Sequence, residues 1–519
     1  MKLSNLKQRL IEKNSNLPEN QRRISSLRKE FRNKKEHGLN ELKNESIAER
    51  QVEWIPTFET RQVGEYKKNV ELSNLHSQTS ISLPEQKSND IVVGDTYSVD
   101  KIKIIGITGS KGKSTTAYIV HEYLKLLGYK SVLHSSIQID SPAGYTNKNE
   151  ACEIPLYNEN GLLDIIEEAE AIDADYIVLE VNESTIKKGL VNDIPFSVRA
   201  LTNINPLHNV EQYSKEEYVR LKQSFFENIP ANEECTCVFG LVDVFTRDDF
   251  NQLLRLNNHP KVTYGTKYIC ELRNADYSNI DCLLYGMSNS INGLGMEIRV
   301  KENSFDFKTN VILPHNAINF TCAIAIIEAL GIFNAASFNK CVENMTIPGR
   351  EEVIRVQNRT IVIGLFLEPA LENFKKYKEM NEANQVKVIL GAIGTGFSSW
   401  SKEFSTELFI SKRSSARRFA VNYAKEYADY IYITSNDNAA ENPVSIAEEL
   451  QGYINNQVPS CIVVDREEAI RKAIVESQRG DIIYISGRGN RRIFCDSANT
   501  VKLIQDKEVV YKVISELGW

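Results

Sequence analysis

The sequence predicts an α/β protein in which a central domain with a parallel sheet precedes a second, Rossmann-like domain. Three observations support this prediction. A glycine-rich loop joins a strand to a helix within Ile104–Thr116, strands and helices alternate from about Thr96, and the alternation restarts after the Pro-Gly-Arg sequence at 348–350. Residues 1–95 lack this pattern and are expected to form an atypical N-terminal region that is polar and largely helical.

The composition excludes several function classes. The chain has 519 residues, which is too long for one core, and we divide it into regions 1–95, 96–346 and 347–519. A net charge of −7 gives no electrostatic basis for binding nucleic acid. No apolar run approaches membrane-spanning length, the charged start has no apolar signal core, and the nine cysteines show no zinc spacing. We therefore expect a cytoplasmic protein with reduced cysteines and no membrane insertion.

The N-terminal region offers two interpretations. Leu3, Leu6 and Leu10 are spaced as on one face of a helix, and a second such set follows in residues 24–31. The basic residues of this second segment form either a solvated helix face or part of an arm, within residues 1–60, that docks a protein partner. Residues 60–95 are rich in Ser, Asn and Gln and are expected to be a linker.

Short β-branched runs and amphipathic segments alternate through the central region. The expected strands are Lys101–Ile107, Ser131–Leu133, Tyr176–Val181, Phe196–Ile204, Cys237–Phe239, Val262–Tyr264, Cys282–Tyr285, Met296–Val300 and Thr309–Leu313. The expected helices are Lys113–Leu127, Gly161–Ala171, Glu216–Asn228 and Pro314–Leu330. Such alternation favours parallel strands joined by helical crossovers.

The C-terminal region repeats the alternation. The expected strands are Thr360–Leu367, Val386–Leu390, Tyr430–Thr434, Cys461–Val464 and Asp481–Ser486. The expected helices are Leu371–Glu379, Ser415–Tyr427, Val444–Tyr453 and Arg466–Ser477. The glycine fingerprint of dinucleotide-binding domains does not follow the first strand. Gly391–Gly396 follows the second strand, and a lone loop of this kind favours a turn over a dinucleotide site.

The loop between the first strand and helix has the chemistry of a phosphate-binding loop. Its backbone N–H groups can surround a phosphate, Lys113 can reach the β- and γ-phosphates, and the Ser114 hydroxyl can bind Mg²⁺. The general P-loop pattern places glycine where this chain has Ile107, so the spacing departs from that pattern. The predicted nucleotide-binding residues are Gly109, Ser110, Lys111, Gly112, Lys113, Ser114 and Thr115.

Two further side chains follow strands of the same predicted sheet. Glu180 ends one strand and His208 lies in the loop after another, so both can meet Ser114 at the carboxyl edge and complete a magnesium–nucleotide site. Taken alone, Glu180 can equally be a helix-capping acid and His208 an ordinary loop histidine. Lys222, in mid-helix, would on spacing alone be a solvated lysine.

The order of these motifs resembles that of the Mur ligases, ATP-dependent amide ligases that build the peptidoglycan stem peptide. The segment Gly106–Thr115 is similar to their variant phosphate loop, including its departure from the general spacing. Further segments resemble their Glu-Val-Ser-Ser-His, Thr-Asn-Leu-x-x-Asp-His, Asn-x-x-Asn and Pro-Gly-Arg motifs, namely Leu179–Ser184, Thr202–His208, Pro314–Asn319 and Pro348–Arg350. The resemblance covers about residues 100–510 and is greatest to the UDP-N-acetylmuramoyl-tripeptide synthetase branch.

The resemblance implies a mechanism and a cofactor set of ATP and Mg²⁺. ATP would phosphorylate a carboxylate, and an amine, expected to be an amino acid, would attack the acyl phosphate. Lys113, His208 and Lys222 would be catalytic, with Ser114 and Glu180 serving the first Mg²⁺. His208 and a carbamylated Lys222 would serve the second Mg²⁺, because Lys222 falls where the family carries that modification. The remaining implied nucleotide contacts are Asn316 at the adenine and Arg350 from the hinge.

Other family motifs are replaced. The substrate-binding Ser-Ser-His reads Asn182-Glu183-Ser184, which puts UDP-muramoyl-dipeptide in doubt as the substrate. The diaminopimelate-binding Asp-Asn-Pro-Arg and Gly-His-Glu motifs become Asn436–Ala439 and Gly489–Arg491, so we predict that diaminopimelate is not the amine. The family motif Asp-Tyr-Ala-His-x-Pro becomes Gly364–Pro369. Arg488 and Arg491 remain as candidate anchors for the substrate carboxylate, with a solvated turn as the alternative.

These observations leave three hypotheses. The first is an ATP-dependent, ADP-forming ligase that joins a small-molecule carboxylate to an amine and differs from the standard peptidoglycan enzymes. The second is a peptidoglycan ligase with an unusual N-terminal region. The third is a nucleotide-binding partner protein without catalysis, and release of phosphate from ATP separates it from the first two.

Overall fold

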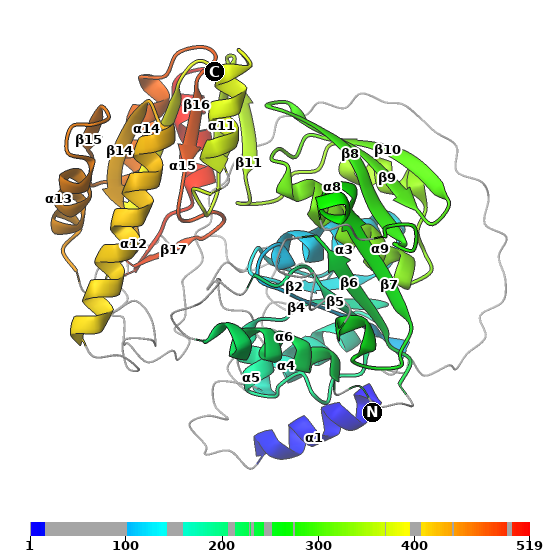
Figure 1. The fold of residues 1–519 in the computed structure, drawn as a ribbon. Coiled ribbons are helices and arrows are strands. Elements are labelled where there is room, and N and C mark those ends of the chain that lie inside the picture. The colour runs from blue at the N-terminus through cyan, green and yellow to red at the C-terminus, as the bar shows by residue number, and fades with distance from the viewer. Residues whose placement is uncertain are drawn as a thin grey trace, which may run out of the picture.

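A computed structural model describes residues 2–15, 101–142, 159–205, 213–227, 229, 233–242, 252–272, 276–368, 370–394, 406–438, 441–495 and 501–519. These residues form two α/β units, each built on its own sheet (Figure 1). The N-terminal helix lies against the central unit, on the side away from the C-terminal unit (Figure 1). The predicted linker at 60–95 lies outside the described residues.

The central sheet of the described chain has ten strands in the order β10-β9-β8-β7-β6-β5-β1-β4-β2-β3. Strand β1 (Lys103–Thr108) lies between β4 (Tyr176–Glu180) and β5 (Phe196–Leu201), parallel to both. The other strands are β2 (Ser131–His134), β3 (Ile139–Asp140), β6 (Thr236–Leu241), β7 (Lys261–Thr266), β8 (Cys282–Ser290), β9 (Gly293–Val300) and β10 (Asn303–Thr309). The strands β2, β3 and β4 lie on one side of β1, and after β4 the chain continues with β5 on the other side. The end of β1 is therefore a topological switch point, where open α/β sheets bind ligands.

The edge of this sheet differs from the parallel arrangement that the sequence suggested. Strands β8, β9 and β10 are antiparallel neighbours. Only residues 291–292 and 301–302 separate them, and such short connections cannot carry the crossover that parallel strands require. The β8–β10 segment is therefore a meander at one edge of the parallel strands β8, β7, β6, β5, β1, β4 and β2, and the short β3 at the other edge is antiparallel to β2.

Helices cover the central sheet as the alternation predicted. Helix α9 (His315–Ala329) is buried along most of its length and packs beside α3 (Lys113–Leu126). Its run of small and branched apolar residues explains why it can be covered on all sides. The other helices of this unit are α4 (Glu159–Ala171), α5 (Glu183–Lys187), α6 (Lys215–Glu227), α8 (Lys267–Leu272) and α10 (Ala335–Val342).

The C-terminal unit is a six-stranded sheet in the order β11-β12-β16-β13-β14-β15, parallel except for the β11–β12 hairpin. Its strands are β11 (Glu352–Val356), β12 (Arg359–Ile363), β13 (Val386–Ala392), β14 (Tyr430–Ser435), β15 (Ser460–Ile462) and β16 (Ile482–Ile485). Its helices are α11 (Ala370–Glu379), α12 (Thr406–Tyr427), α13 (Pro443–Ile454), α14 (Arg466–Val475) and α15 (Asp506–Glu516), and a two-stranded ribbon pairs β17 (Ile493–Cys495) with β18 (Val501–Leu503). This is the predicted Rossmann-like arrangement.

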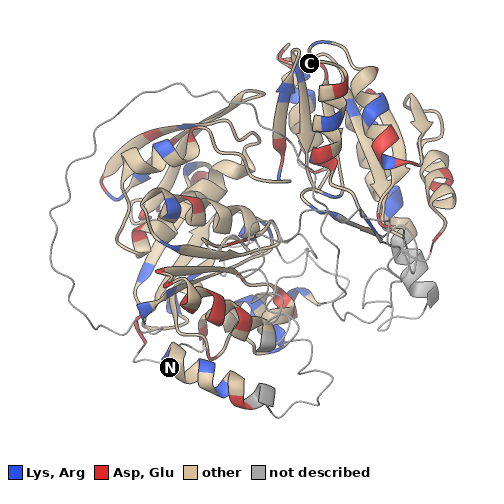
Figure 2. Cartoon of the chain, turned by 180° about the vertical axis from the view of Figure 1, so that it is seen from behind, with Lys and Arg blue, Asp and Glu red and all other residues tan. Residues whose placement is uncertain are grey.

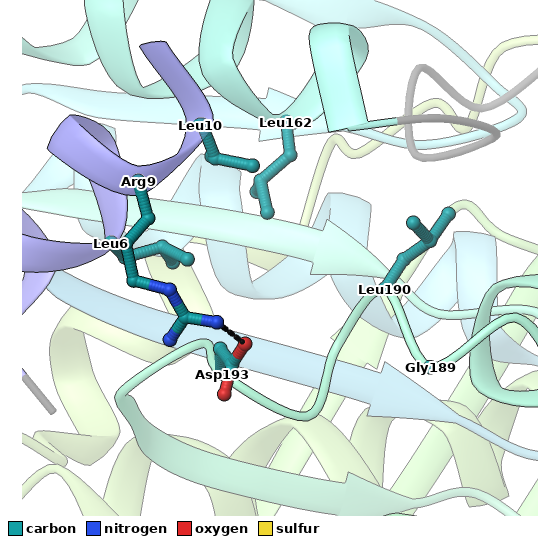
Figure 3. A pocket seen from close by; sticks show the side chains of 7 residues that line it. All are labelled: Leu6, Arg9, Leu10, Leu162, Gly189, Leu190 and Asp193. Carbon is teal, nitrogen blue, oxygen red and sulfur yellow. Dashed lines mark hydrogen bonds and ion pairs between the residues drawn. The ribbon is translucent and has the colours of Figure 1, made fainter. Parts of the chain in front are cut away.

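Helix α1 (Leu3–Ser15) uses its apolar face within the chain itself. Leu3, Leu6 and Leu10 are buried in the core of the central unit, and Arg9 pairs with Asp193 at 2.9 Å (Figure 3). The predicted helix is therefore confirmed, and its leucine face is covered by the central unit. Residues 16–60, which hold the rest of the proposed docking arm, lie outside the described residues.

The surface and the helices fit the composition. Acidic and basic residues are interspersed over both units on the face drawn in Figure 2. Within the described residues, none of the helices is both long and apolar enough to cross a membrane. Most of the described cysteines are buried, and those described are free thiols.

Candidate active site

The loop between β1 and α3 depends on two glycines with positive φ. Gly109 has φ 143° and Gly112, the residue before α3, has φ 83°. A Cβ at Gly109 would lie 1.9 Å from Thr202 Oγ1, and one at Gly112 would lie 2.3 Å from Asn319 Oδ1. Glycine is therefore required at both positions for conformation and for space. The loop is consequently held tightly between the end of β5 and the start of α9.

The residues after β5 fix the loop from one side. Ser110 N donates to Asn203 O at 3.0 Å, and Lys111 N donates to Asn203 Oδ1 at 3.1 Å. Thr202 Oγ1 donates to Lys111 O at 2.6 Å. The first turn of α3 follows directly, and its N–H groups, which have no partners within the helix, are the natural site for a phosphate.

Lys113 folds back over this loop. Its Nζ donates to Gly109 O at 2.9 Å and to Ser110 O at 3.3 Å. The ammonium is thus held at the loop rather than extended into solvent. A cation in this position can neutralise the phosphate charge that the loop would receive.

Ser136, just after β2, joins three of the predicted site residues. Its backbone N donates to Glu180 Oε2 at 2.8 Å, and its hydroxyl lies 2.7 Å from Ser114 Oγ. Arg350 Nη2 donates to the same hydroxyl at 3.1 Å. Ser114 and Glu180 are buried, so two oxygen donors of the kind that Mg²⁺ prefers face one small polar site.

The contact between Arg350 and Ser136 also connects the two units. Asn490 Nδ2 donates to Ile137 O at 3.0 Å, beside Ser136. Lys111 Nζ lies 5.9 Å from the ring centre of Phe366, which follows the first parallel strand of the C-terminal sheet. The C-terminal unit therefore faces the phosphate loop, and a molecule bound at the loop would contact both units.

A buried ion pair closes the inner side of the loop. Lys222 on α6 is fully buried, and its Nζ lies 2.8 Å from Glu183 Oε1 and donates to Thr108 Oγ1 at 3.1 Å. Burial lowers the pKa of Lys222 to about 8, although the Glu183 carboxylate opposes that shift. Burial alone would raise the pKa of Glu183, but the charges of Lys222 and Lys113 outweigh it and lower the pKa to about 2. Tyr218 OH donates to Glu183 Oε1 at 3.0 Å and lies 2.9 Å from Ser110 Oγ.

The remaining predicted site residues have different surroundings. His208 lies outside the described residues. Asn316, buried at the start of α9, donates to Ile312 O at 2.8 Å and accepts from Asn319 at 3.1 Å. Its role at the adenine stays a prediction.

The two candidate arginine anchors differ from each other. Arg488 is fully buried and pairs with Asp437 at 2.6 Å, whereas Arg491 is 24% exposed and lies 3.5 Å from Asp437. An incoming carboxylate can therefore reach Arg491, but it would have to displace Asp437 to reach Arg488. The simple anchor role predicted for Arg488 does not fit this burial.

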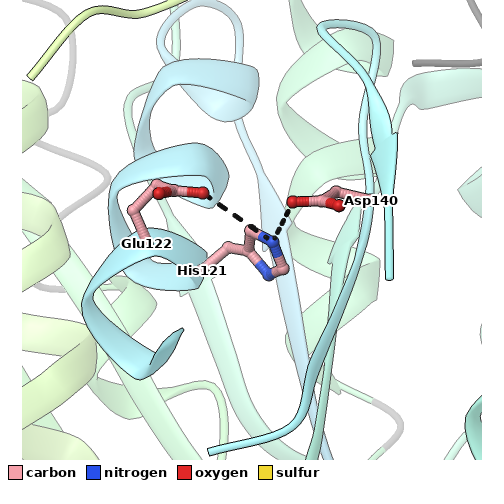
Figure 4. Close-up of side chains that lie close together, drawn as sticks. All are labelled: His121, Glu122 and Asp140. Atoms are coloured by element: carbon pink, nitrogen blue, oxygen red, sulfur yellow. Dashed lines mark hydrogen bonds and ion pairs between the residues drawn. The ribbon is translucent and has the colours of Figure 1, made fainter. Parts of the chain in front are cut away.

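A second polar cluster lies further along α3 (Figure 4). His121 Nε2 lies 3.0 Å from Asp140 Oδ2, and its Nδ1 lies 2.8 Å from Ser131 Oγ. Lys125 donates to both Asp140 and Glu122 at 2.9 Å. Burial disfavours the charge of Asp140, but hydrogen bonds from His121 and Lys125 outweigh this and lower its pKa to about 2. Because an ammonium already bridges the carboxylates, this cluster is better suited to holding α3 on β2 and β3 than to binding a metal.

Sequence reasoning did not assign site roles to Ser136, Tyr218, Asn203 or Glu183. Ser136 follows a strand that neighbours β4, so the strand-end rule that selected Glu180 could also have selected it. Tyr218 is one turn before Lys222 on α6, and that spacing is the signal that places both on one helix face. The Glu183 pairing carries no sequence signal, because it depends on where α5 and α6 meet.

Comparison with known proteins finds similarity to the Mur ligases over both α/β units. Residues 107–327 match the Mur ligase middle domain, and residues 367–489 match the Mur ligase, glutamate ligase domain. A UDP-N-acetylmuramoyl-L-alanyl-D-glutamate–2,6-diaminopimelate ligase of Geobacillus kaustophilus is 23% identical over 423 residues, 80% of each chain. A UDP-N-acetylmuramyl-tripeptide synthetase of Bifidobacterium longum is 25% identical over 434 residues, 80% of this chain and 78% of its own.

A solved structure shares the fold. The structure of a UDP-N-acetylmuramoyl-L-alanyl-D-glutamate–2,6-diaminopimelate ligase superposes with a TM-score of 0.54 at 18% identity. The superposition covers 80% of this chain and 79% of that one. The shared region spans both α/β units described above.

Proposed function

We propose, from the premise that this chain belongs to the Mur ligase family, that it joins a substrate carboxylate to an amine other than diaminopimelate at the expense of ATP. One observation carries the proposal. Ser136 connects Ser114 and Glu180 of the central unit with Arg350 of the hinge, so the loop, its acid and the second unit converge on one site. The carboxylate would be phosphorylated there, and the amine would approach from the C-terminal unit.

The chemistry would proceed in two displacements. A carboxylate oxygen attacks the γ-phosphorus of ATP, and ADP leaves. The amine nitrogen then attacks the acyl carbon, loses a proton, and inorganic phosphate leaves. Both steps bring several negative charges together, so positioning and charge neutralisation are what the protein must provide.

Each predicted residue has a task in this scheme. The first turn of α3 and Lys113 would hold the phosphates, because Lys113 already lies over the loop. Arg350 would contact the transferred phosphoryl group or the nucleotide from the hinge, since its side chain is directed at Ser136. Asn316 would contact the adenine, and His208 and Lys222 would act near the reacting carboxylate.

The donor set fits Mg²⁺. Ser114 and Glu180 offer a hydroxyl and a carboxylate that both approach Ser136, and hard divalent cations prefer such oxygen ligands. Bound there, Mg²⁺ would neutralise phosphate charge. Ser136 would keep the two ligands oriented through its N–H and its hydroxyl.

The surroundings of the predicted amine site support the exclusion of diaminopimelate. Asp437, within the segment that replaces the family's arginine motif, is buried and paired with Arg488. Asn490, where the family carries a histidine, donates to Ile137 O and accepts from Gln505 at 2.6 Å. Neither group is available for the second carboxylate and ammonium of diaminopimelate. Arg491 would instead take the single carboxylate of an amino acid.

The test measures phosphate release by the full-length chain with ATP, Mg²⁺, pooled carboxylates and pooled amino acids, followed by mass spectrometry of the product. We expect release that requires both a carboxylate and an amine. UDP-N-acetylmuramoyl-L-alanyl-D-glutamate with diaminopimelate is the matched comparison, and we expect little turnover with it. Efficient turnover of that pair would overturn the amine proposal, and nucleotide binding without release in any mixture would favour a non-catalytic partner protein.

A further inference from the structure

The hinge carries a buried carboxyl group that the proposed mechanism does not use. Glu351 directly follows Arg350, and only 8% of its side chain is exposed. Within the described residues its carboxyl group takes part in no hydrogen bond, and its contact with His315 Nε2, at 3.8 Å, is beyond hydrogen-bonding distance. Because buried polar groups nearly always have a partner, this group calls for an explanation.

The backbone also holds Glu351 in an unusual conformation. Its φ is 48°, in the left-handed region that residues other than glycine rarely adopt. Such a conformation costs free energy and is found most often at functional sites. The next acid, Glu352, serves the fold, because it accepts from Gly349 N at 2.9 Å and pairs with Lys507. Of these two hinge acids, Glu351 is thus the one without a described hydrogen bond.

The charges around Glu351 compensate for its burial only in part. His315 is uncharged at neutral pH, because desolvation and the charge of Lys111 lower its pKa to about 4. Burial raises the pKa of Glu351 to about 7, although the Arg350 guanidinium opposes this shift. The Arg350 side chain itself is directed at Ser136. Hydrogen-bond donors on a bound molecule would therefore stabilise the Glu351 carboxylate.

Glu351 approaches the path that a bound nucleotide would take. Asn319 of α9 borders the phosphate loop, since a Cβ at Gly112 would lie 2.3 Å from its Oδ1. Asn316, one turn earlier on the helix, is the predicted adenine contact, and His315 is its neighbour. The contact with His315 places the Glu351 carboxyl group at the first turn of α9, at the end of the path where the base is expected.

The other end of this path is the phosphate end. Arg350 reaches Ser136 there, and Arg350 and Glu351 together line a cavity at the hinge. A nucleotide that extends from the loop to Asn316 places its ribose between the ends that these two residues approach. The ribose is uncharged and has two adjacent hydroxyl donors, for which a carboxylate is a suitable acceptor. A phosphate group at the same place would be repelled by the acid.

We propose that Glu351 binds the ribose of ATP, with its carboxylate accepting hydrogen bonds from the 2′ and 3′ hydroxyl groups, and so selects ribonucleotides. The inference rests on the proposed function, because it concerns the same nucleotide. It assigns to the buried acid the hydrogen bonds that the described chain does not give it. It also gives the left-handed backbone at Glu351 a role, since that conformation directs the carboxyl group at α9 while Arg350 is directed at Ser136.

The experiment measures binding of ADP, 2′-deoxy-ADP and 3′-deoxy-ADP to the full-length protein with Mg²⁺ by isothermal titration calorimetry. We expect the unaltered protein to bind ADP about tenfold or more tightly than either deoxynucleotide. In Glu351→Gln this ratio should fall to about threefold or less, because a neutral amide is a weaker acceptor than a carboxylate. Glu343→Gln, which changes an exposed acid before the hinge, is the control and should keep the full ratio.

A second variant separates recognition of the ribose from a structural role. Glu351→Gly removes the carboxyl group and suits the left-handed backbone. Both variants should keep the circular dichroism spectrum of the unaltered protein, since neither removes a described side-chain hydrogen bond. A purely structural role would change the affinity for all three nucleotides alike. The inference is overturned if either folded variant keeps the ratio of the unaltered protein, or if the unaltered protein does not discriminate.

These readouts separate the inference from the proposed function, because none of them requires turnover. Discrimination that depends on Glu351, with no phosphate release in any substrate mixture, would contradict the ligase proposal alone. Turnover by a protein that binds ADP and both deoxynucleotides equally would contradict the inference alone. A protein that binds none of the three nucleotides would contradict both.

Discussion

The carboxyl edges of the two parallel sheets use polar residues in opposite ways. At the central edge, Ser114, Glu180 and Arg350 meet at one serine and face the space above the phosphate loop. At the C-terminal edge, Asp437 and Arg488 are fully buried and neutralise each other. The same topological rule brings polar residues to both edges. The difference leads us to propose that the first edge receives an external anion, whereas the buried pair at the second edge holds the fold together.

The largest effect expected from this comparison is at Lys113. Replacing Lys113 by Ala removes the cation held over the loop by Gly109 and Ser110. We expect phosphate release to fall by about 1,000-fold, which corresponds to roughly 4 kcal/mol of transition-state stabilisation. The control is Lys130→Ala, which changes an exposed lysine directly before β2. Activity within threefold of the unaltered protein would contradict the assignment of this edge to the nucleotide.

The matching change at the C-terminal edge is Asp437→Asn. It leaves Arg488 buried without its counter-charge, so we expect the unit to lose about 3 kcal/mol of stability. Chemical denaturation followed by circular dichroism measures this loss, and exposed Asp306→Asn serves as the control. An unchanged unfolding midpoint would mean that the pair does not serve the fold as we describe.

The sequence predicted those residues of the central edge whose positions depend on local structure. Lys113 and Ser114 follow from a strand–loop–helix sequence, and Glu180 follows from the end of a strand. The structure brings Ser114 and Glu180 together through Ser136. The strand-end rule could have selected Ser136, but its contact with Glu180 requires β2 to lie beside β4, which local sequence does not show. The catalytic and metal-binding roles of these residues stay predictions.

The parts that sequence reasoning missed depend on long-range contacts. Glu183 was interpreted only as the loss of a substrate motif, yet it pairs with Lys222, which is on another helix. Arg488 was a candidate anchor because arginines binding carboxylates and arginines in internal ion pairs have the same sequence signature. The antiparallel strands β8 to β10 were missed although no helix was predicted between them, and that absence was the available signal.

The buried pair of Glu183 and Lys222 at the central edge should make the stability of the protein depend on pH. The pKa of Glu183 is lowered from 4.5 to about 2, so its contribution to stability is present above the unfolded value and is lost as pH falls between these two values. We expect this group to account for roughly 3 kcal/mol of the acid-induced loss. The sign is the same for Lys222, because burial lowers its pKa from 10.5 to about 8, so stability again rises as pH increases through that range.

The measurement for this dependence is denaturant unfolding of the unaltered protein and Glu183→Gln at several pH values. The variant is expected to be less stable at neutral pH, because Lys222 then lacks its partner, and to lose less stability on acidification. The exposed control Glu227→Gln should follow the unaltered protein throughout. Parallel curves for Glu183→Gln and the unaltered protein would show that the pair does not titrate as a buried unit.

The smallest expected effect concerns Arg491, the partly exposed arginine beside the buried pair. If the C-terminal edge retains one charge for the substrate, Arg491→Ala should raise the KM for the amine about tenfold, or roughly 1.4 kcal/mol, with little change in kcat. Stability should change little, because Arg491 is 24% exposed and its contact with Asp437 is 3.5 Å long. Exposed Arg479→Ala is the control. A stability loss as large as that of Asp437→Asn, with the KM unchanged, would assign Arg491 to the fold and leave the amine carboxylate to be bound elsewhere on this edge.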